Sequence, residues 1–154
     1  MPTPYDGGCA CGKIRYQLTE EPLTLYACHC TECQRQTGTA FGLSMIILRS
    51  ALQLLQGQPR DYEATVPGGS PPRRGKFCDA CATRLWSEPA RFPEVLVLRP
   101  GTLDDTSWLD PVAHIWMRSA QPWVVLPADA QTFDTQPEDP LALINLWHQR
   151  RRAT

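Results

Sequence analysis

Short runs of alternating apolar and polar residues recur along the chain. Ile14, Tyr16 and Leu18 are apolar at every second position, which is the pattern of a half-buried β-strand. Fifteen prolines and ten glycines interrupt the sequence, leave little room for long helices, and mark 65–72 and 101–111 as exposed loops. These features predict a mainly β domain of short antiparallel strands. The other segments with strand character are 40–48, 51–56, 73–77, 84–87, 94–99 and 114–117.

The clearest helical pattern lies near the C-terminus. Asp139 has the side chain of an N-cap, and Pro140 suits the first helical position. The arginines at 150–152 suit the negative end of the helix dipole. We therefore expect a helix near 139–152, within a C-terminal extension, 124–154, that covers the sheet and carries no chemistry. Its apolar stripe comprises Leu141, Ile144 and Trp147.

Length and charge narrow the possible functions. The chain has 154 residues, which suits a single domain with its own core. A formal net charge of -1 gives no electrostatic reason to expect nucleic acid or an anionic membrane as a partner. The sequence lacks a basic segment followed by an apolar one at its start, and no window approaches the ~20 apolar residues of a membrane span. We therefore expect a soluble cytoplasmic protein.

Cysteines are the most prominent candidate chemical groups. In a reducing cytoplasm they suit metal binding or reactivity better than disulfides, and an odd number leaves one thiol unpaired in any disulfide framework. The seven cysteines form three clusters, which are Cys9 and Cys11, then Cys28, Cys30 and Cys33, then Cys78 and Cys81.

The spacing within each cluster suits chelation of one ion. In extended backbone the residues i and i+2 face the same side, so each C-x-C pair aims two sulfurs one way, whereas C-x-x-C folds its sulfurs together in a tight knuckle. Thiolates favour zinc, and four of them close a structural site while three leave the open position of a catalytic site. Seven ligands therefore suit one site of each kind. Spacing alone leaves the pairing of the clusters open, because a hairpin turning at 20–22 would bring the first cluster near the second.

Two other roles suit these cysteines less well. A thioredoxin-type C-x-x-C stands at the start of a helix in a βαβ unit, and neither CTEC nor CDAC has a convincing helix pattern after it. A single nucleophilic cysteine with His29 or His114 as its base leaves six cysteines without a role. His29 lies between two ligands that face one way, so we expect it to point away from the metal, toward supporting groups or a substrate.

Charge around the clusters is a further consideration. Four thiolates on Zn²⁺ leave about -2 and three leave about -1, so loading both sites would take the net charge from -1 to roughly -4. Nearby cations are expected to offset this charge. The candidates in sequence are Arg35, Arg73, Arg74 and Lys76.

Five segments carry a resemblance to a known family, namely GGCACGKIRY, CHCTECQRQTGTAFG, RRGKFCDACATRLW, LRPGTLDD and HIWMRSAQPW. In this order and spacing the chain resembles the glutathione-dependent formaldehyde-activating enzyme family, which also includes centromere protein V-like proteins, over residues 5–123. The resemblance implies a β-tent of short antiparallel sheets organised around two zinc ions, one structural and one catalytic. The implied ligands of the structural zinc are Cys9, Cys11, Cys78 and Cys81. The implied ligands of the catalytic zinc are Cys28, Cys30 and Cys33.

One residue departs from the pattern of that family. Members usually carry glycine directly after the second C-x-x-C, where this chain has Ala82. Glycine there would take a positive φ, and an alanine in the left-handed conformation costs roughly 1 kcal/mol. The departure therefore concerns the local geometry of the knuckle and not the existence of the site.

The resemblance also implies an activity. The chain would be a zinc-dependent carbon-sulfur lyase that adds a zinc-activated glutathione thiolate to formaldehyde or a similar small aldehyde, or reverses that reaction. Arg35 and Thr37 are candidates to meet a carboxylate or amide of glutathione, and Trp116 and Trp123 are candidates to wall its pocket. Two alternatives stay open, which are a non-catalytic zinc-stabilised binding module and a lyase acting on a different thiol adduct.

Overall fold

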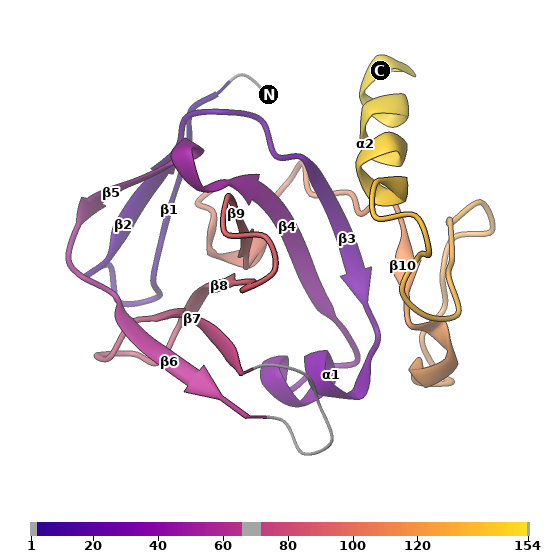
Figure 1. Ribbon diagram of the computed structural model, residues 1–154, viewed down its shortest axis with the longest axis horizontal. Helices are drawn as coiled ribbons and strands as arrows, with labels where there is room; N and C mark the ends of the chain where they lie inside the picture. The colour runs from indigo at the N-terminus through magenta and orange to yellow at the C-terminus, as the bar shows by residue number, and fades with distance from the viewer. Residues whose placement is uncertain (1–2, 66–71, 154) are drawn as a thin grey trace. The chain divides into compact units, whose positions relative to one another are not determined.

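The computed structural model describes residues 3–65 and 72–153 and is mainly β, with a helix at the C-terminal end (Figure 1). The predicted fold class is confirmed, and the predicted loop at 65–72 lies almost entirely outside the described residues. The strands are β1 (Tyr5–Gly8), β2 (Arg15–Leu18), β3 (Thr24–Cys28), β4 (Gly42–Leu48), β5 (Leu52–Gln56), β6 (Arg60–Ala64), β7 (Arg73–Phe77), β8 (Arg84–Glu88), β9 (Val95–Leu98) and β10 (His114–Ile115). The helices are α1 (Thr31–Thr37) and α2 (Ala142–Ala153), and three short 3₁₀ turns are η1 (Arg49–Ala51), η2 (Pro100–Thr102) and η3 (Met117–Ser119).

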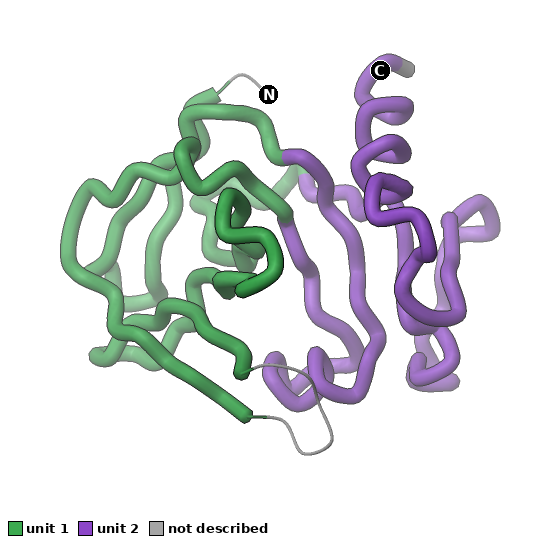
Figure 2. Tube along the Cα trace, viewed as in Figure 1, with its two compact units in different colours: residues 1–22, 46–108 green, residues 23–45, 109–154 purple. Residues whose placement is uncertain are grey.

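The chain divides into two compact units, each built from two separate segments (Figure 2). Unit 1 consists of residues 1–22 and 46–108, and unit 2 consists of residues 23–45 and 109–154. The chain passes between the units at three points, and one of them, between residues 45 and 46, falls within β4. Four of the seven cysteines belong to unit 1, and the other three belong to unit 2.

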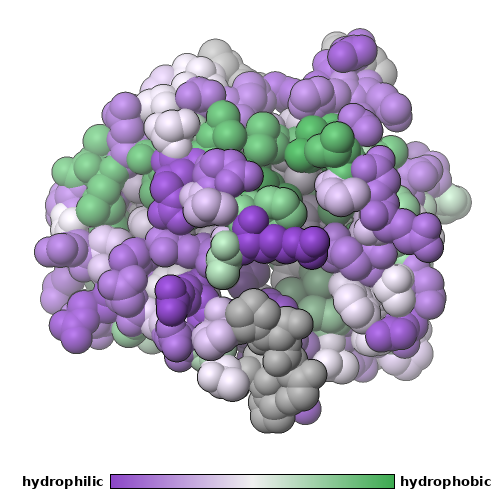
Figure 3. All heavy atoms as spheres, in the orientation of Figure 1, coloured by the Kyte–Doolittle hydropathy of each residue, from purple (hydrophilic) through white to green (hydrophobic). Residues whose placement is uncertain are grey.

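A three-stranded antiparallel sheet in the order β1-β2-β5 forms one part of unit 1. Tyr16 and Leu18 are fully buried, as their alternation with polar residues predicts. β5 forms an edge of this sheet, where Leu54 is 45% exposed and Leu55 is 57% exposed. Apolar side chains are visible over this strand in the space-filling view (Figure 3). The turn of the β1–β2 hairpin, residues 9–14, carries the first two cysteines.

The other part of unit 1 is an antiparallel array in the order β6-β7-β8-β9. Leu85, Leu96 and Leu98 are almost completely buried in it. Full burial of a leucine side chain contributes about 1.5–3 kcal/mol, so these residues are a main source of stability in this part of the chain. The turn between β7 and β8 carries the last two cysteines.

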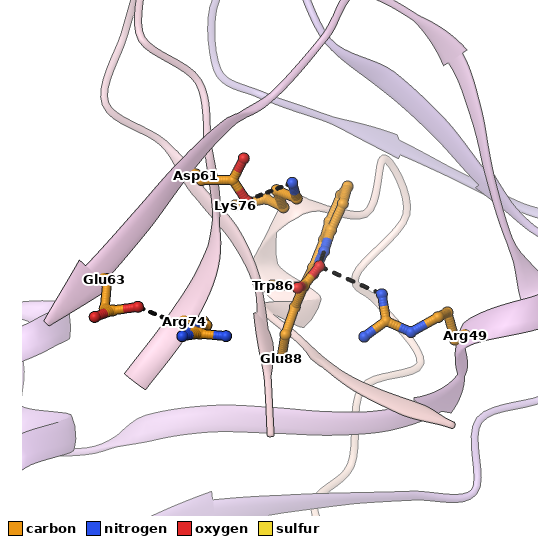
Figure 4. A network of polar contacts seen from close by, with 7 residues as sticks. All are labelled: Arg49, Asp61, Glu63, Arg74, Lys76, Trp86 and Glu88. Atoms are coloured by element: carbon orange, nitrogen blue, oxygen red, sulfur yellow. Dashed lines mark hydrogen bonds and ion pairs between the residues drawn. The ribbon is translucent and has the colours of Figure 1, made fainter. Parts of the chain in front are cut away.

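Charged pairs cross from β6 to β7 (Figure 4). Lys76 Nζ lies 2.5 Å from Asp61 Oδ1, and Arg74 Nε lies 2.7 Å from Glu63 Oε2. Both pairs are direct partners in the strand register. Arg74 and Lys76, two of the cations expected to offset the charge of the cysteine clusters, therefore lie opposite carboxylates and pair with them. Exposed pairs of this kind contribute only about 0–1 kcal/mol each.

In unit 2, β3 lies between β10 and β4. β10 pairs with β3 in parallel, with His114 opposite Ala27 and Ile115 opposite Cys28. The prediction of antiparallel pairing is wrong for this pair. A tight hairpin forces antiparallel pairing, whereas the long connection between β3 and β10 permits either direction.

The C-terminal helix α2 forms where the capping pattern predicts it, but it buries a different face. The Leu141 N–H donates to Asp139 Oδ1 at 2.8 Å, so Asp139 provides the expected cap. Leu143 and Trp147 are buried, whereas Leu141 is 56% exposed. The predicted stripe is thus wrong at its first member, since residues four apart share a helix face more closely than residues six apart. The Thr24 hydroxyl donates to the Leu143 carbonyl at 2.9 Å and ties α2 to β3.

Three strands, β1, β3 and β6, lack a clear alternation of apolar and polar residues and were not predicted from the sequence. β1 reads YDGG and contains two glycines, which are poor strand formers. β3 reads TLYAC and is buried at four of its five positions, so it has no polar face to produce alternation. β6 reads RDYEA and buries none of its side chains completely. Pairing with neighbouring strands, and not local preference, stabilises each of them.

Two candidate metal centres

The first candidate centre is the four-cysteine cluster of unit 1, formed by Cys9, Cys11, Cys78 and Cys81. The turn after β1 supplies the first two residues and the turn after β7 supplies the last two, and all four sulfurs lie within 4.8 Å of one another. Cys11 Sγ lies 3.5 Å from Cys9 Sγ and 3.8 Å from Cys78 Sγ. A tetrahedron of sulfurs about 2.3 Å from a zinc ion has edges of about 3.8 Å. The donor set and its spacing therefore fit a structural zinc ion.

Backbone and hydroxyl groups support these sulfurs. The Ile14 N–H points to Cys9 Sγ at 3.3 Å. Burial acts to raise the pKa of Cys9, but this N–H and the thiols of Cys11 and Cys78 lower it below its usual value. The hydroxyl of Thr83, 3.2 Å from Cys81 Sγ, and the N–H of Thr83 lower the pKa of Cys81 to about 6. A lowered pKa favours the thiolate, which is the form that binds metal. The Lys13 N–H acts to lower the pKa of Cys11, but Cys9, burial and the other thiols raise it to about 11. Each turn thus contains one cysteine, Cys9 or Cys81, whose surroundings favour the thiolate.

Ala82, the residue that departs from the family pattern, has a φ of +60°. Its N–H donates to the Cys78 carbonyl at 2.8 Å and closes the turn that holds the last two ligands. A left-handed conformation is strained for an alanine. The expectation that this position needs a positive φ is confirmed.

The Ala82→Gly variant is expected to raise the free energy of unfolding by about 1 kcal/mol, because glycine takes a positive φ without the clash of a Cβ. The gain is reduced by the greater freedom of glycine in the unfolded chain. Urea denaturation in the presence of zinc measures it. Ala80→Gly is the matched control, since Ala80 lies in the same turn without a positive φ, and it should lower stability. Equal changes in the two variants would contradict the strain assigned to Ala82.

The second candidate centre is the three-cysteine cluster of unit 2, formed by Cys28, Cys30 and Cys33. Cys28 ends β3, Cys30 is the N-cap of α1, and Cys33 lies in the first turn of that helix. The three sulfurs lie within 4.8 Å of one another. Among the residues that the structure describes, no histidine, aspartate or glutamate joins this group. The cluster therefore fits a zinc ion with three protein ligands and an open position.

The helix α1, which begins within CTEC, corrects an expectation, because the sequence showed no convincing helix there. Cys30 Sγ accepts from the Cys33 N–H at 3.3 Å, which is a side-chain cap made by a thiol in place of the usual oxygen. Gly38 ends the helix with a φ of 66° and donates to the Gln34 carbonyl at 2.9 Å. The Thr-Gly pair at 37–38 was the available signal for a helix end. One objection to a redox dithiol thus disappears, but Cys28 adds a third sulfur that such a motif does not use.

The pKa values of two thiols in this cluster are shifted in opposite directions. Contacts with Cys28 and then Cys33 lower the pKa of Cys30 to about 2. Contacts with Cys30 and then Cys33, together with burial, raise the pKa of Cys28 well above its usual range. The surroundings therefore favour Cys30 as the thiolate and Cys28 as the neutral thiol. A divalent cation that displaces the thiol protons would bind three thiolates at once.

His29 points away from the cluster and pairs with a second buried histidine. Its Nε2 lies 3.0 Å from Nδ1 of His114 on β10. The ring of Phe41 packs against the His29 ring, with 5.0 Å between the two ring centres. His29 is completely buried and His114 is 9% exposed. Burial and the neighbouring His114 lower the pKa of His29, and burial lowers the pKa of His114. Both rings are thus neutral at pH 7, with one nitrogen donating and the other accepting.

The four residues proposed from sequence to hold glutathione lie in different surroundings. Arg35 is exposed on α1, and the Thr37 hydroxyl donates to the Cys33 carbonyl at 2.9 Å. Trp116 has a φ of 61° and lies under Arg118, whose guanidinium is 4.8 Å from the ring centre. Trp123 is 70% exposed and lines a pocket of about 380 Å³. The other lining residues, which the sequence did not single out, are Gly38, Thr39, Ala40 and Gln121.

Fold and thiol clusters together define a class of small, mainly β protein with one group of four and one group of three clustered cysteines. A family model described as glutathione-dependent formaldehyde-activating enzyme matches residues 4–119, and the chain belongs to this family. The resemblance found in the sequence is confirmed.

Two similar proteins illustrate this relationship. A protein from Halomonas elongata, provisionally named a glutathione-dependent formaldehyde-activating enzyme, is 26% identical over 152 residues, which cover 94% of each chain. A crystal structure of a protein from Rhodobacter sphaeroides matches with a TM-score of 0.51 and 19% identity, over 69% of this chain and 91% of that one. At this identity the second match concerns the fold alone.

In the part of the chain that the structure describes, no helix is both long enough and apolar enough to span a membrane.

Proposed function

We propose that the chain is a carbon-sulfur lyase that joins glutathione to formaldehyde, or to a similar small aldehyde, and reverses that reaction. Membership of the family supports glutathione and formaldehyde as substrates. The observation that carries the proposal is the three-cysteine cluster, to which the described part of the chain adds no fourth side-chain ligand. A four-ligand cluster elsewhere in the chain already suffices for a structural ion.

The proposed reaction forms one carbon-sulfur bond. The glutathione sulfur adds to the aldehyde carbon, the electron pair of the C=O bond moves to oxygen, and the oxygen takes up the proton that the thiol has lost. The product is S-hydroxymethylglutathione, and the reverse step breaks the carbon-sulfur bond. A zinc ion at the three-cysteine cluster would supply a Lewis acid that lowers the pKa of a thiol beside it.

The residues of the chain have separate tasks in this proposal. Cys28, Cys30 and Cys33 would hold the ion and leave one side of it to the substrate. The buried pair of His29 and His114 supports the peptide between the first two ligands. Bringing thiol and aldehyde together would account for much of the acceleration, since a bimolecular encounter becomes a local one.

We further propose that 5–123 forms the zinc domain, that 124–154 is its C-terminal extension, and that the protein works in the cytoplasm. The family match over residues 4–119 supports the bounds proposed for the zinc domain. We also propose that Arg35, Thr37, Trp116 and Trp123 contact glutathione, with support strongest for Trp123 because it lines a pocket.

Metal analysis and adduct exchange test the proposed function. The purified chain should contain two zinc ions and should accelerate exchange between free glutathione and S-hydroxymethylglutathione, measured by NMR, above the uncatalysed rate. Two zinc ions without acceleration would reject this activity. A retained protein partner would then favour the binding module, and acceleration with another thiol alone would favour a different adduct.

A further inference from the structure

The side-chain amide of Gln34, on α1, makes three hydrogen bonds. Its Nε2 donates to the His29 carbonyl at 2.7 Å and to the Ser119 carbonyl at 2.8 Å. Its Oε1 accepts from Nε2 of Gln121 at 2.8 Å. Both amide hydrogens and the carbonyl oxygen are therefore used, and the side chain joins the segment of the candidate ligands to η3 and to Gln121 just after it.

The first of these bonds acts on the peptide between two candidate ligands. His29 stands between Cys28 and Cys30, so the orientation of its carbonyl is coupled to the direction in which both sulfurs point. The His29 ring is hydrogen-bonded to the His114 ring, and the His29 backbone N–H donates to the Ile115 carbonyl at 3.0 Å. Gln34 supplies the remaining contact, and with it this residue is held at its N–H, its ring and its carbonyl.

We propose that Gln34 is a positioning residue that sets the geometry of the three-cysteine cluster through the His29 carbonyl, with Gln121 orienting the Gln34 amide. Gln121 also lines the pocket that contains Trp123, so a molecule in that pocket contacts the side chain that orients Gln34. The inference rests on the proposed function only in that a metal occupies this cluster. Groups that hold metal ligands in place typically change metal affinity or activity by about 10–100-fold when they are removed.

Cobalt binding tests this role without relying on activity. The full chain, first given one equivalent of zinc to fill the four-cysteine cluster, is titrated with Co²⁺, and the thiolate-to-cobalt absorption bands report both affinity and geometry. Gln34→Met keeps the length of the side chain and removes all three bonds. We expect it to weaken cobalt binding by about 10–100-fold and to shift the bands.

Gln36→Met is the matched control, because it makes the same change on the same helix, where Gln36 Nε2 bonds to Glu32 Oε1 at 3.1 Å. It should leave the cobalt affinity and bands as in the unmodified chain. Gln121→Met removes one of the three bonds and should weaken binding in the same direction by a smaller factor. If Gln34→Met does not fold, Gln121→Met decides the question, and unchanged cobalt bands in it would overturn the inference.

The remaining outcomes separate this inference from the proposed function. Unmodified protein that binds no cobalt at the three cysteines would reject the proposed function itself. Normal binding in the unmodified protein and in Gln34→Met would overturn the role of Gln34 alone. An equal loss in Gln36→Met would also overturn it, since the effect would then belong to the helix as a whole.

Discussion

The Cys30→Ser variant is expected to lose more than about 100-fold in glutathione-dependent activity while it retains its fold. Serine is nearly the same size as cysteine, but its hydroxyl does not ionise near neutral pH and is a poor ligand for zinc. Only two sulfurs would remain in the cluster. Loss of a metal ligand should reduce activity by more than the about 10–100-fold that loss of a group supporting a ligand typically causes. Cys30 also caps α1, and a serine oxygen accepts the same Cys33 N–H, so the helix start is preserved.

Adduct exchange by NMR measures the activity, and metal analysis should show one zinc ion per chain in place of two. Circular dichroism and thermal unfolding should remain close to those of the unmodified chain. Activity within a few-fold of normal, with two zinc ions still bound, would contradict the assignment of Cys30 as a ligand of the reactive centre.

The Cys78→Ser variant is expected to have the opposite pattern, with a large loss of stability in unit 1. The four-cysteine cluster joins two turns whose cysteines are far apart in the chain, since Cys11 and Cys78 are separated by 67 positions. Structural zinc contributes about 10–16 kcal/mol to the folding of zinc-finger peptides, which is comparable to the entire 5–15 kcal/mol stability of a typical domain. A loss of only about 4 kcal/mol would lower the Tm of a chain of this size by roughly 8–16 °C.

Calorimetry measures this loss, and hydrogen exchange locates it. Amides of β1, β2, β7 and β8 should exchange faster, because the two hairpins would no longer be joined. Chelation of both ions in the unmodified chain should reproduce the effect. Cys30→Ser is the control from the other cluster and should have a much smaller effect on these amides. Equal Tm changes in the two serine variants would contradict the division into a structural and a reactive centre.

The fold was predictable where local sequence determines local structure. Alternation located β2, because one face of that strand is buried and the other is not. It missed β3, which is buried at four of its five positions, and β6, which has no completely buried position, because neither has two contrasting faces. The start of α1 was missed because a thiol occupies the capping position that is usually filled by an oxygen.

The candidate sites were likewise predictable only in part. The seven cysteines and their spacing are evident in the chain, and the resemblance to the family supplied their partition into four and three. Gln34 gave no signal of its own, because its role depends on the carbonyls of His29 and Ser119, which are distant from each other in sequence. The same is true of His114, which meets His29 across a separation of 85 positions.

The sequence by itself determined the set of candidate ligands and the class of fold, since thiol spacing and the burial pattern of each strand act over a few neighbouring residues. Tertiary structure decided which distant groups meet. It placed Cys11 beside Cys78, set Arg74 and Lys76 opposite carboxylates, and enclosed His29 among His114, Phe41 and Gln34. The physical reason is that strand pairing and burial bring these groups together only when the whole chain has folded.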